Sequence, residues 1–192
     1  MNVNIVEMQS NDAYRKIMQE CKGNLWILKN LIKDKDEESK KNYIQAYNRL
    51  CQRLGCWIGC SSTWKSAPTL PHGFSGIFIS DGAKIGQHSV IFQNVTIGSN
   101  ALKNSRGEGS PIIGDNVYIG AGATIVGKCK IGNNVRIGAG CSVAIDIPDN
   151  SVVVSQKPVI IHKENMDNRF YHYENGKYGF VEDGIFHPVS DK

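Results

Sequence analysis

The sequence lacks any apolar run long enough to cross a membrane, and its N-terminus lacks the apolar core of a signal peptide. Its 22 basic and 18 acidic residues leave a net charge of only +4, and lysine and arginine form no dense cluster. These absences argue against membrane insertion and against nucleic-acid binding, which needs a concentrated basic surface. The sequence also contains no metal-ligand cluster and no Walker-type phosphate loop, so we expect no metal site.

The six cysteines form no Cys-x-x-Cys pair. We therefore expect a reduced, cytoplasmic setting for the protein. Cys129 and Cys141 fall where alanine or valine would serve equally well, so we interpret them as buried small apolar residues. Cys56 and Cys60 flank a Trp-Ile-Gly segment and are a candidate redox pair.

A six-residue repeat fills the middle of the chain. An isoleucine, or once a valine, recurs at Ile79, Ile85, Ile91, Ile97, Ile113, Ile119, Ile125, Ile131, Ile137 and Val143. Four residues after each of these comes a small or β-branched residue, namely Ala83, Ser89, Val95, Ala101, Val117, Ala123, Cys129, Val135, Cys141 and Ile147. This period matches neither a helix nor a simple alternating strand, and it predicts a coil with three flat sides per turn. We expect the isoleucines and these small residues to point inward, with glycine or asparagine at the corners.

The regions around the repeat are expected to differ from it. Apolar stripes predict helices over 11–33 and 38–54, the second ended by Gly55. After the repeat, Asn175-Gly176 predicts a β-hairpin in an aromatic tail that covers the end of the coil. The predicted organisation is a helical segment over 1–56, a β-helix over 57–161 and a capping tail over 162–192.

Two interruptions break the period. Three extra residues lie between Leu70 and Ile79, beside His72, and ten extra residues lie between Ile97 and Ile113. The second insertion, approximately Leu102 to Pro111, is polar and cannot join the core. We expect it to project from a rigid scaffold, where functional residues tend to concentrate.

Three motifs carry a family resemblance. They are Leu70-Pro71-His72-Gly73, the run from Gln93 to Gly98, and the block from Gly114 to Ala123. Over roughly residues 57–160 the chain resembles the hexapeptide-repeat acyltransferases, and most of all the serine acetyltransferase branch with its relatives in polysaccharide biosynthesis. The resemblance implies a mainly β fold, a left-handed parallel β-helix, and acetyl-CoA as the acyl donor. A three-sided prism with a slot between subunits also predicts a homotrimer.

The resemblance selects candidate site residues. Acyl transfer to a hydroxyl needs a general base, and of the five histidines His72 occupies the place of the family's catalytic histidine. His88 is expected at a corner, facing solvent. The positions that match the family's cofactor contacts are Ser99, Ala121, Arg136 and Ala139, with Arg136 placed to meet phosphates.

Two departures concern the base. Where serine acetyltransferases usually carry an aspartate just before this histidine, the chain has Pro71, and an acidic residue fifteen positions earlier is replaced by Trp57. The residue that orients His72 must therefore come from elsewhere, and Asp81 and Glu108 are the candidates.

A third departure concerns the acceptor. Gly109 and Ser110 stand where the family often has an Arg-His pair that binds the serine carboxylate. Losing such a clamp removes a strong recognition element, so we expect free serine to be a poor acceptor and a hydroxyl of a saccharide or glycan precursor to be a better one. Serine O-acetylation is the alternative activity, and a non-catalytic β-helix scaffold is the second alternative.

Overall fold

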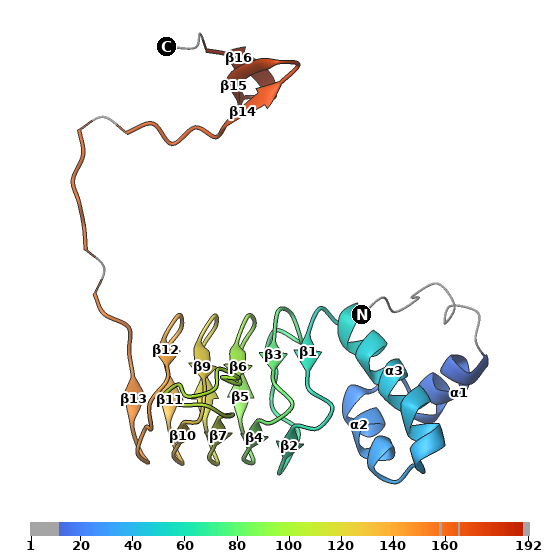
Figure 1. Ribbon diagram of the computed structural model, residues 1–192. Coiled ribbons are helices and arrows are strands. Elements are labelled where there is room, and N and C mark those ends of the chain that lie inside the picture. Colours follow the sequence, from blue (N-terminus) through green and yellow to red (C-terminus); the bar gives the residue numbers. More distant parts are fainter. Residues whose placement is uncertain (1–11, 158, 165, 190–192) are drawn as a thin grey trace. The chain divides into compact units, whose positions relative to one another are not determined.

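The computed structural model describes residues 12–157, 159–164 and 166–189. The chain divides into two compact units, one up to Gln156 and one from Lys157 onward. The first unit holds the helices and a coil of short parallel strands, and the second holds a small antiparallel sheet (Figure 1). No helix within the described ranges is long and apolar enough to span a bilayer.

The N-terminal segment forms three helices where two were predicted. They are α1 (Asp12–Glu20), α2 (Leu25–Lys33) and α3 (Glu37–Arg53). The predicted helix over 11–33 is wrong in its middle, and its first residue lies outside the described residues. The chain turns at Lys22 and Gly23, whose φ angles of 51° and 65° a right-handed helix does not contain. Asn24 then caps α2 by accepting hydrogen bonds from two backbone amides of its first turn.

The second predicted helix is confirmed as α3. The side chain of Asp36 accepts hydrogen bonds from two amides of the first turn. Gly55, with a φ of 68°, follows the last turn. The amide of Cys56 donates to the carbonyl of Cys51 across this end at 3.0 Å, as expected when a glycine follows a helix C-terminus.

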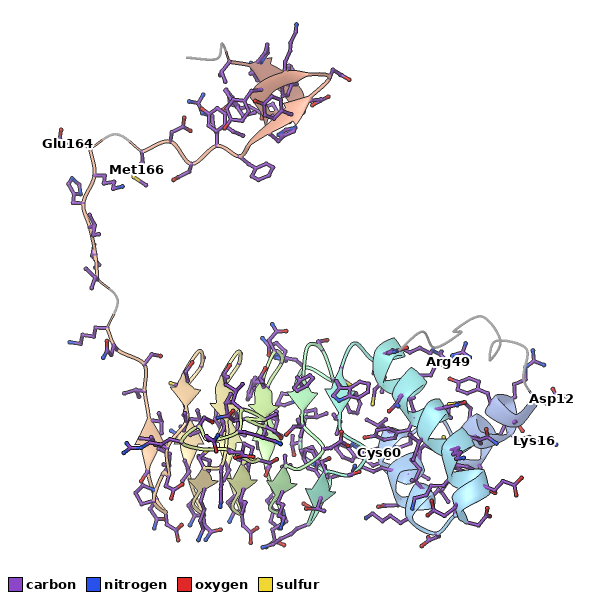
Figure 2. All side chains as sticks on the ribbon, in the orientation of Figure 1. Asp12, Lys16, Arg49, Cys60, Glu164 and Met166 are labelled. Atoms are coloured by element: carbon purple, nitrogen blue, oxygen red, sulfur yellow. The ribbon has the colours of Figure 1, made fainter. Side chains whose placement is uncertain are left out.

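The helices cover the first coil of the β-helix (Figure 1). Leu28 and Tyr47 are fully buried, and they join the same core as Ile58 and Ile79. Lys29 is also buried, and its ammonium donates hydrogen bonds to the carbonyls of Gly59 and Cys60; Figure 2 shows Cys60 where the helices meet the coil. The helical segment therefore satisfies carbonyls at the open end of the coil, which would otherwise be exposed.

Three parallel sheets form the sides of the coil, and each of the inner coils contributes one strand to each sheet, while the first and last coils contribute two strands each and a single bridge at the third side. The first sheet contains β1 (Trp57–Ile58), β3 (Phe78–Ile79), β6 (Thr96–Gly98), β9 (Thr124–Val126) and β12 (Ser142–Val143). The second contains β2 (Thr63–Trp64), β4 (Lys84–Ile85), β7 (Ile112–Ile113) and β10 (Lys130–Ile131). The third contains β5 (Val90–Ile91), β8 (Tyr118–Ile119), β11 (Arg136–Ile137) and β13 (Val152–Val153). The coil is a left-handed parallel β-helix, as predicted.

The repeat isoleucines fill the axis of the coil, as predicted. In the first sheet, Ile58, Ile79, Ile97 and Ile125 are directly in register, and each is at most 1% exposed. Since each repeat position stacks directly on the same position of the preceding coil, one residue type can form a continuous core.

One inward position differs from the prediction. Ala101 was expected to point inward, but it is exposed. Pro111 is buried in its place and lies between Ala83 and Cys129 in the stack of coils. The ten extruded residues are therefore 101–110, one residue earlier than expected, because the chain re-enters the core at the proline.

Left-handed backbone marks the corners. Asn116, Asn134 and Asn150 all have φ near 56° at one corner, and His88 takes the same conformation in the preceding coil. Asparagine tolerates this region better than other side chains. His88 is exposed, so its predicted corner position is confirmed.

The C-terminal unit is a three-stranded antiparallel sheet formed by β14 (Tyr171–Glu174), β15 (Lys177–Glu182) and β16 (Ile185–Pro188). The hairpin at Asn175-Gly176 is confirmed, since both residues have positive φ angles, as a tight two-residue turn requires. Asp183-Gly184 forms a second such turn that was not predicted. The capping role of this tail stays a prediction, as do the boundaries of the three predicted domains. The last strand that joins the coil is β13.

Candidate functional site

His72 lies in the bulge that follows Leu70, at the corner between the third and the first sheet. The bulge is a series of turns in which Gly73 and Gly76 have φ angles near 67°. A β-carbon on Gly76 would lie 2.0 Å from Oδ1 of Asn94, so only glycine allows the bulge to pack this closely on the next coil. The bulge leaves the His72 side chain exposed on a backbone that the scaffold holds in place.

Gln93 orients the His72 ring. Nδ1 of His72 lies 2.6 Å from Oε1 of Gln93, and the ring meets Phe92 edge-on, with centroids 5.3 Å apart. A carbonyl oxygen can only accept a hydrogen bond, so Nδ1 carries the proton in this arrangement and Nε2 keeps its lone pair. The expected partners, Asp81 and Glu108, do not contact His72. Asp81 instead accepts a hydrogen bond from the amide of Ser61 at 2.9 Å.

Gln93 was not proposed as a site residue from the sequence, although a signal was present. It occupies the corner position that Ala121 and Ala139 occupy in the following coils, and the amides of Gly122 and Gly140 bond to the carbonyls of Gln93 and Ala121. A long polar side chain where equivalent coils have a methyl group indicates a role outside the core.

Two of the residues predicted to contact the cofactor lie at the same corner of the coil as His72. Ala121 and Ala139 follow Gln93 along this corner, where their small side chains leave the backbone accessible. Arg136 lies on the adjacent third sheet, directly in register with Tyr118, and its guanidinium is 6.0 Å from the Tyr118 ring. The rings of Phe92 and Tyr118 have centroids 5.1 Å apart and planes inclined by 51°, so a row of aromatic contacts joins His72 to Arg136.

The remaining predicted residues lie at another corner. Ser99 and Ser110 bring their hydroxyl oxygens to 2.6 Å, and Gly109 pairs with Asn100 through two backbone hydrogen bonds of 2.8 and 2.9 Å. These contacts close the neck of the extruded loop between the first and second sheets. A strand of the first sheet separates this corner from that of His72. One protomer therefore gathers the predicted residues into two groups rather than one.

A pair of thiols and a cavity at the helical end of the coil are lined by other residues than His72. Cys56 faces Cys51 rather than Cys60, and their shared hydrogen bond lowers the pKa of Cys51 and raises the pKa of Cys56. A cavity of about 610 Å³, lined by Trp57, Cys60 and Asp81 among others, lies between α2, α3 and the first coil. Within the described part of the chain, no cluster of His, Cys, Asp or Glu could hold a metal ion.

Comparisons with known proteins agree with this architecture. The family model "Bacterial transferase hexapeptide (six repeats)" matches residues 110–144. A serine acetyltransferase of Synechocystis is 38% identical over 108 residues, which cover 56% of this chain and 41% of the relative.

Solved structures give the same result over a longer stretch. Serine acetyltransferase isoform 3 of Entamoeba histolytica, in complex with cysteine, matches with a TM-score of 0.59 and 28% identity, over 81% of this chain and 52% of that one. The Neisseria gonorrhoeae enzyme in complex with serine matches with a TM-score of 0.59 and 29% identity, over 76% and 56%. The chain thus spans about half the length of these relatives. Its six-residue repeat and its left-handed β-helix resemble those of the serine acetyltransferases.

Proposed function

We propose that this protein transfers an acetyl group from acetyl-CoA to the hydroxyl of a small acceptor, with His72 as the general base. The observation that carries this proposal is the contact between His72 and Gln93, because it leaves Nε2 free to accept a proton from an exposed position. The acceptor oxygen would attack the thioester carbonyl as its proton moves to Nε2. The carbon–sulfur bond then breaks, and the imidazolium returns the proton to the departing thiolate.

We infer that acetyl-CoA lies along the corner that carries Ala121 and Ala139. Small side chains at this corner allow the pantetheine arm to approach the backbone, and Arg136 on the adjacent sheet carries a charge that suits phosphate groups. Ser99 belongs to the predicted set but lies at the other corner. The proposed donor site therefore needs a second surface.

A homotrimer would supply that surface. His72 lies at the corner where the strands of the first sheet begin, and Ser99, Gly109 and Ser110 lie at the corner where those strands end. In a closed ring with threefold symmetry, the first of these corners on each protomer faces the second corner on its neighbour. Each of the three sites would then contain His72 from one protomer and the extruded loop from the next. We also keep the cytoplasmic location that the cysteine usage predicts.

L-serine is the acceptor that we propose first. Curated relatives of the repeat region are serine acetyltransferases, and solved relatives are complexed with serine or cysteine. These similarities favour serine over the saccharide that the sequence predicted. A saccharide hydroxyl remains the second candidate because Gly109 and Ser110 provide only neutral groups. The well-oriented histidine argues against a scaffold without activity.

The test is release of free CoA thiol from acetyl-CoA in the presence of L-serine, of amino sugars and of neutral sugars. The His72→Ala variant should lose roughly 10²–10⁴-fold in turnover, the range for losing a general base, while its melting temperature stays close to that of the wild type. His88→Asn is the matched control, because His88 is exposed and equivalent corners already carry asparagine. A His72→Ala variant with wild-type turnover would refute the proposed mechanism.

A further inference from the structure

An acceptor such as serine carries a carboxylate, and its binding site needs a positive charge. The corner that contains His72 has none, since no lysine or arginine occurs in the segments 70–77, 92–95, 120–123 and 138–141. At the other corner, Lys103 and Arg106 belong to the extruded loop, and Lys128 belongs to the coil itself. A lysine on the coil is held more firmly than one on a loop, so Lys128 is the best-positioned cation.

Lys128 lies directly against Gly109. A β-carbon on Gly109 would be 3.1 Å from Cβ, 3.4 Å from Cγ and 3.6 Å from Cδ of Lys128. The aliphatic stem of the lysine therefore occupies the space that a side chain at position 109 would need. Gly109 also has a φ of 131°, a conformation that side chains of other residues rarely adopt. The glycine at the neck of the loop thus makes room for the lysine.

Backbone hydrogen bonds fix this arrangement. The amide of Lys128 donates to the carbonyl of Gly107 at 2.8 Å, and the amide of Gly127 donates to the carbonyl of Gly98 at 2.9 Å. The loop is thereby attached to the coil on which Lys128 sits. These bonds hold the backbone of Lys128, and with it the start of the lysine side chain, next to the loop that contains Gly109.

The ammonium of Lys128 is available for a ligand. The side chain is exposed, and it takes part in no ion pair within the described ranges of the chain. Glu108 and Arg106 lie nearby in the loop, and both are exposed. At the same corner, the hydroxyl pair of Ser99 and Ser110 offers both a donor and an acceptor.

We propose that Lys128 binds the carboxylate of an amino-acid acceptor and so determines the specificity for serine. The inference rests on the proposed function, and in the proposed trimer Lys128 of one protomer would face His72 of its neighbour. A lysine provides a single point charge, so it would select for a carboxylate without the two parallel hydrogen bonds of an arginine.

The experiment measures thiol release with L-serine and with L-serinamide, which lacks the carboxylate charge. In Lys128→Met the KM for L-serine should rise roughly tenfold to a hundredfold, as expected for loss of a hydrogen bond to a charged group. The KM for L-serinamide and the kcat for both acceptors should stay at wild-type values, and Lys128→Arg should restore most of the affinity. Lys130→Met is the matched control, since this exposed lysine lies two residues away on the second sheet.

A calorimetric titration of L-serine into His72→Ala, with and without Lys128→Met, gives a readout that does not depend on turnover. Weaker binding in the double variant supports the role of Lys128. Equal binding of L-serine by the two variants overturns it. An equal rise in the KM for L-serine and for L-serinamide also overturns it, because the lysine would then support the loop and not bind the carboxylate. If the wild type acetylates only neutral sugars and does not bind serine, the inference is wrong while acetyl transfer stands. If no acceptor releases thiol, the proposed function fails and the titration alone decides the role of Lys128.

Discussion

Replacing Gln93 tests the arrangement on which the proposed mechanism depends. In Gln93→Ala, the hydrogen bond to Nδ1 of His72 is lost, and the ring can rotate or take the other tautomer. A hydrogen bond to a group that becomes charged contributes about 1.5–3 kcal/mol, which corresponds to roughly a tenfold to hundredfold loss of kcat. The edge-on contact with Phe92 remains and limits the disorder of the ring. We therefore expect the lower part of this range.

Gln93→Glu tests whether the amide oxygen of Gln93 faces Nδ1 of His72, because glutamate has the same length as glutamine. A glutamine can also turn its NH₂ group toward Nδ1, which would place the proton on Nε2 and prevent that nitrogen from acting as a base. A carboxylate has only acceptor atoms, so the glutamate variant should match or exceed the wild-type kcat.

The assay is the steady-state rate of thiol release at saturating acetyl-CoA, measured together with the melting temperature. Gln87→Ala is the control, since this glutamine is exposed at another corner and its side chain forms no hydrogen bond within the described residues. A Gln93→Ala variant with wild-type kcat would refute the positioning role. A Gln93→Glu variant as slow as Gln93→Ala would show that the amide itself is needed.

Further predictions concern assembly, the loop and the helical segment. Light scattering should give three times the mass of one chain, and a fully active monomer would contradict the shared site. Deleting residues 101–110 joins Asn100 to Pro111 and restores an unbroken six-residue period, so circular dichroism should show a folded protein while acceptor turnover is lost; an unfolded product would mean that the loop is structural. Lys29→Met should lower the free energy of unfolding by about 1–3 kcal/mol, because buried carbonyls lose their hydrogen-bond donor. Removal of the desolvation cost of the ammonium offsets part of this loss. Lys33→Met, on the exposed side of α2, should have no effect in the same denaturant titration.

The β-helix could be predicted from the sequence because its core is one-dimensional. Each coil contacts mainly its neighbours, so a period of six specifies at once which residues point inward and which strands pair. The position of His72 in a bulge, the extruded loop and the hairpin at Asn175-Gly176 followed from breaks in that period or from local turn chemistry. The exact bounds of the extruded loop could not be predicted, because Ala101 and Pro111 are both small enough for the inward position. Only the path of the backbone decides between them.

Only the tertiary structure revealed the contacts between coils. Gln93 is 21 residues from His72 in sequence, and Lys128 is 19 residues from Gly109. Such pairs meet because one coil stacks on another, and their identity depends on rotamers and on the path of an irregular loop. The break at Lys22 and Gly23 was missed for a related reason, since an apolar stripe continues across the left-handed turn while the capping side chain of Asn24 begins a new helix. Regular repetition is written into the sequence, whereas the site depends on how the irregular segments settle on the repeats.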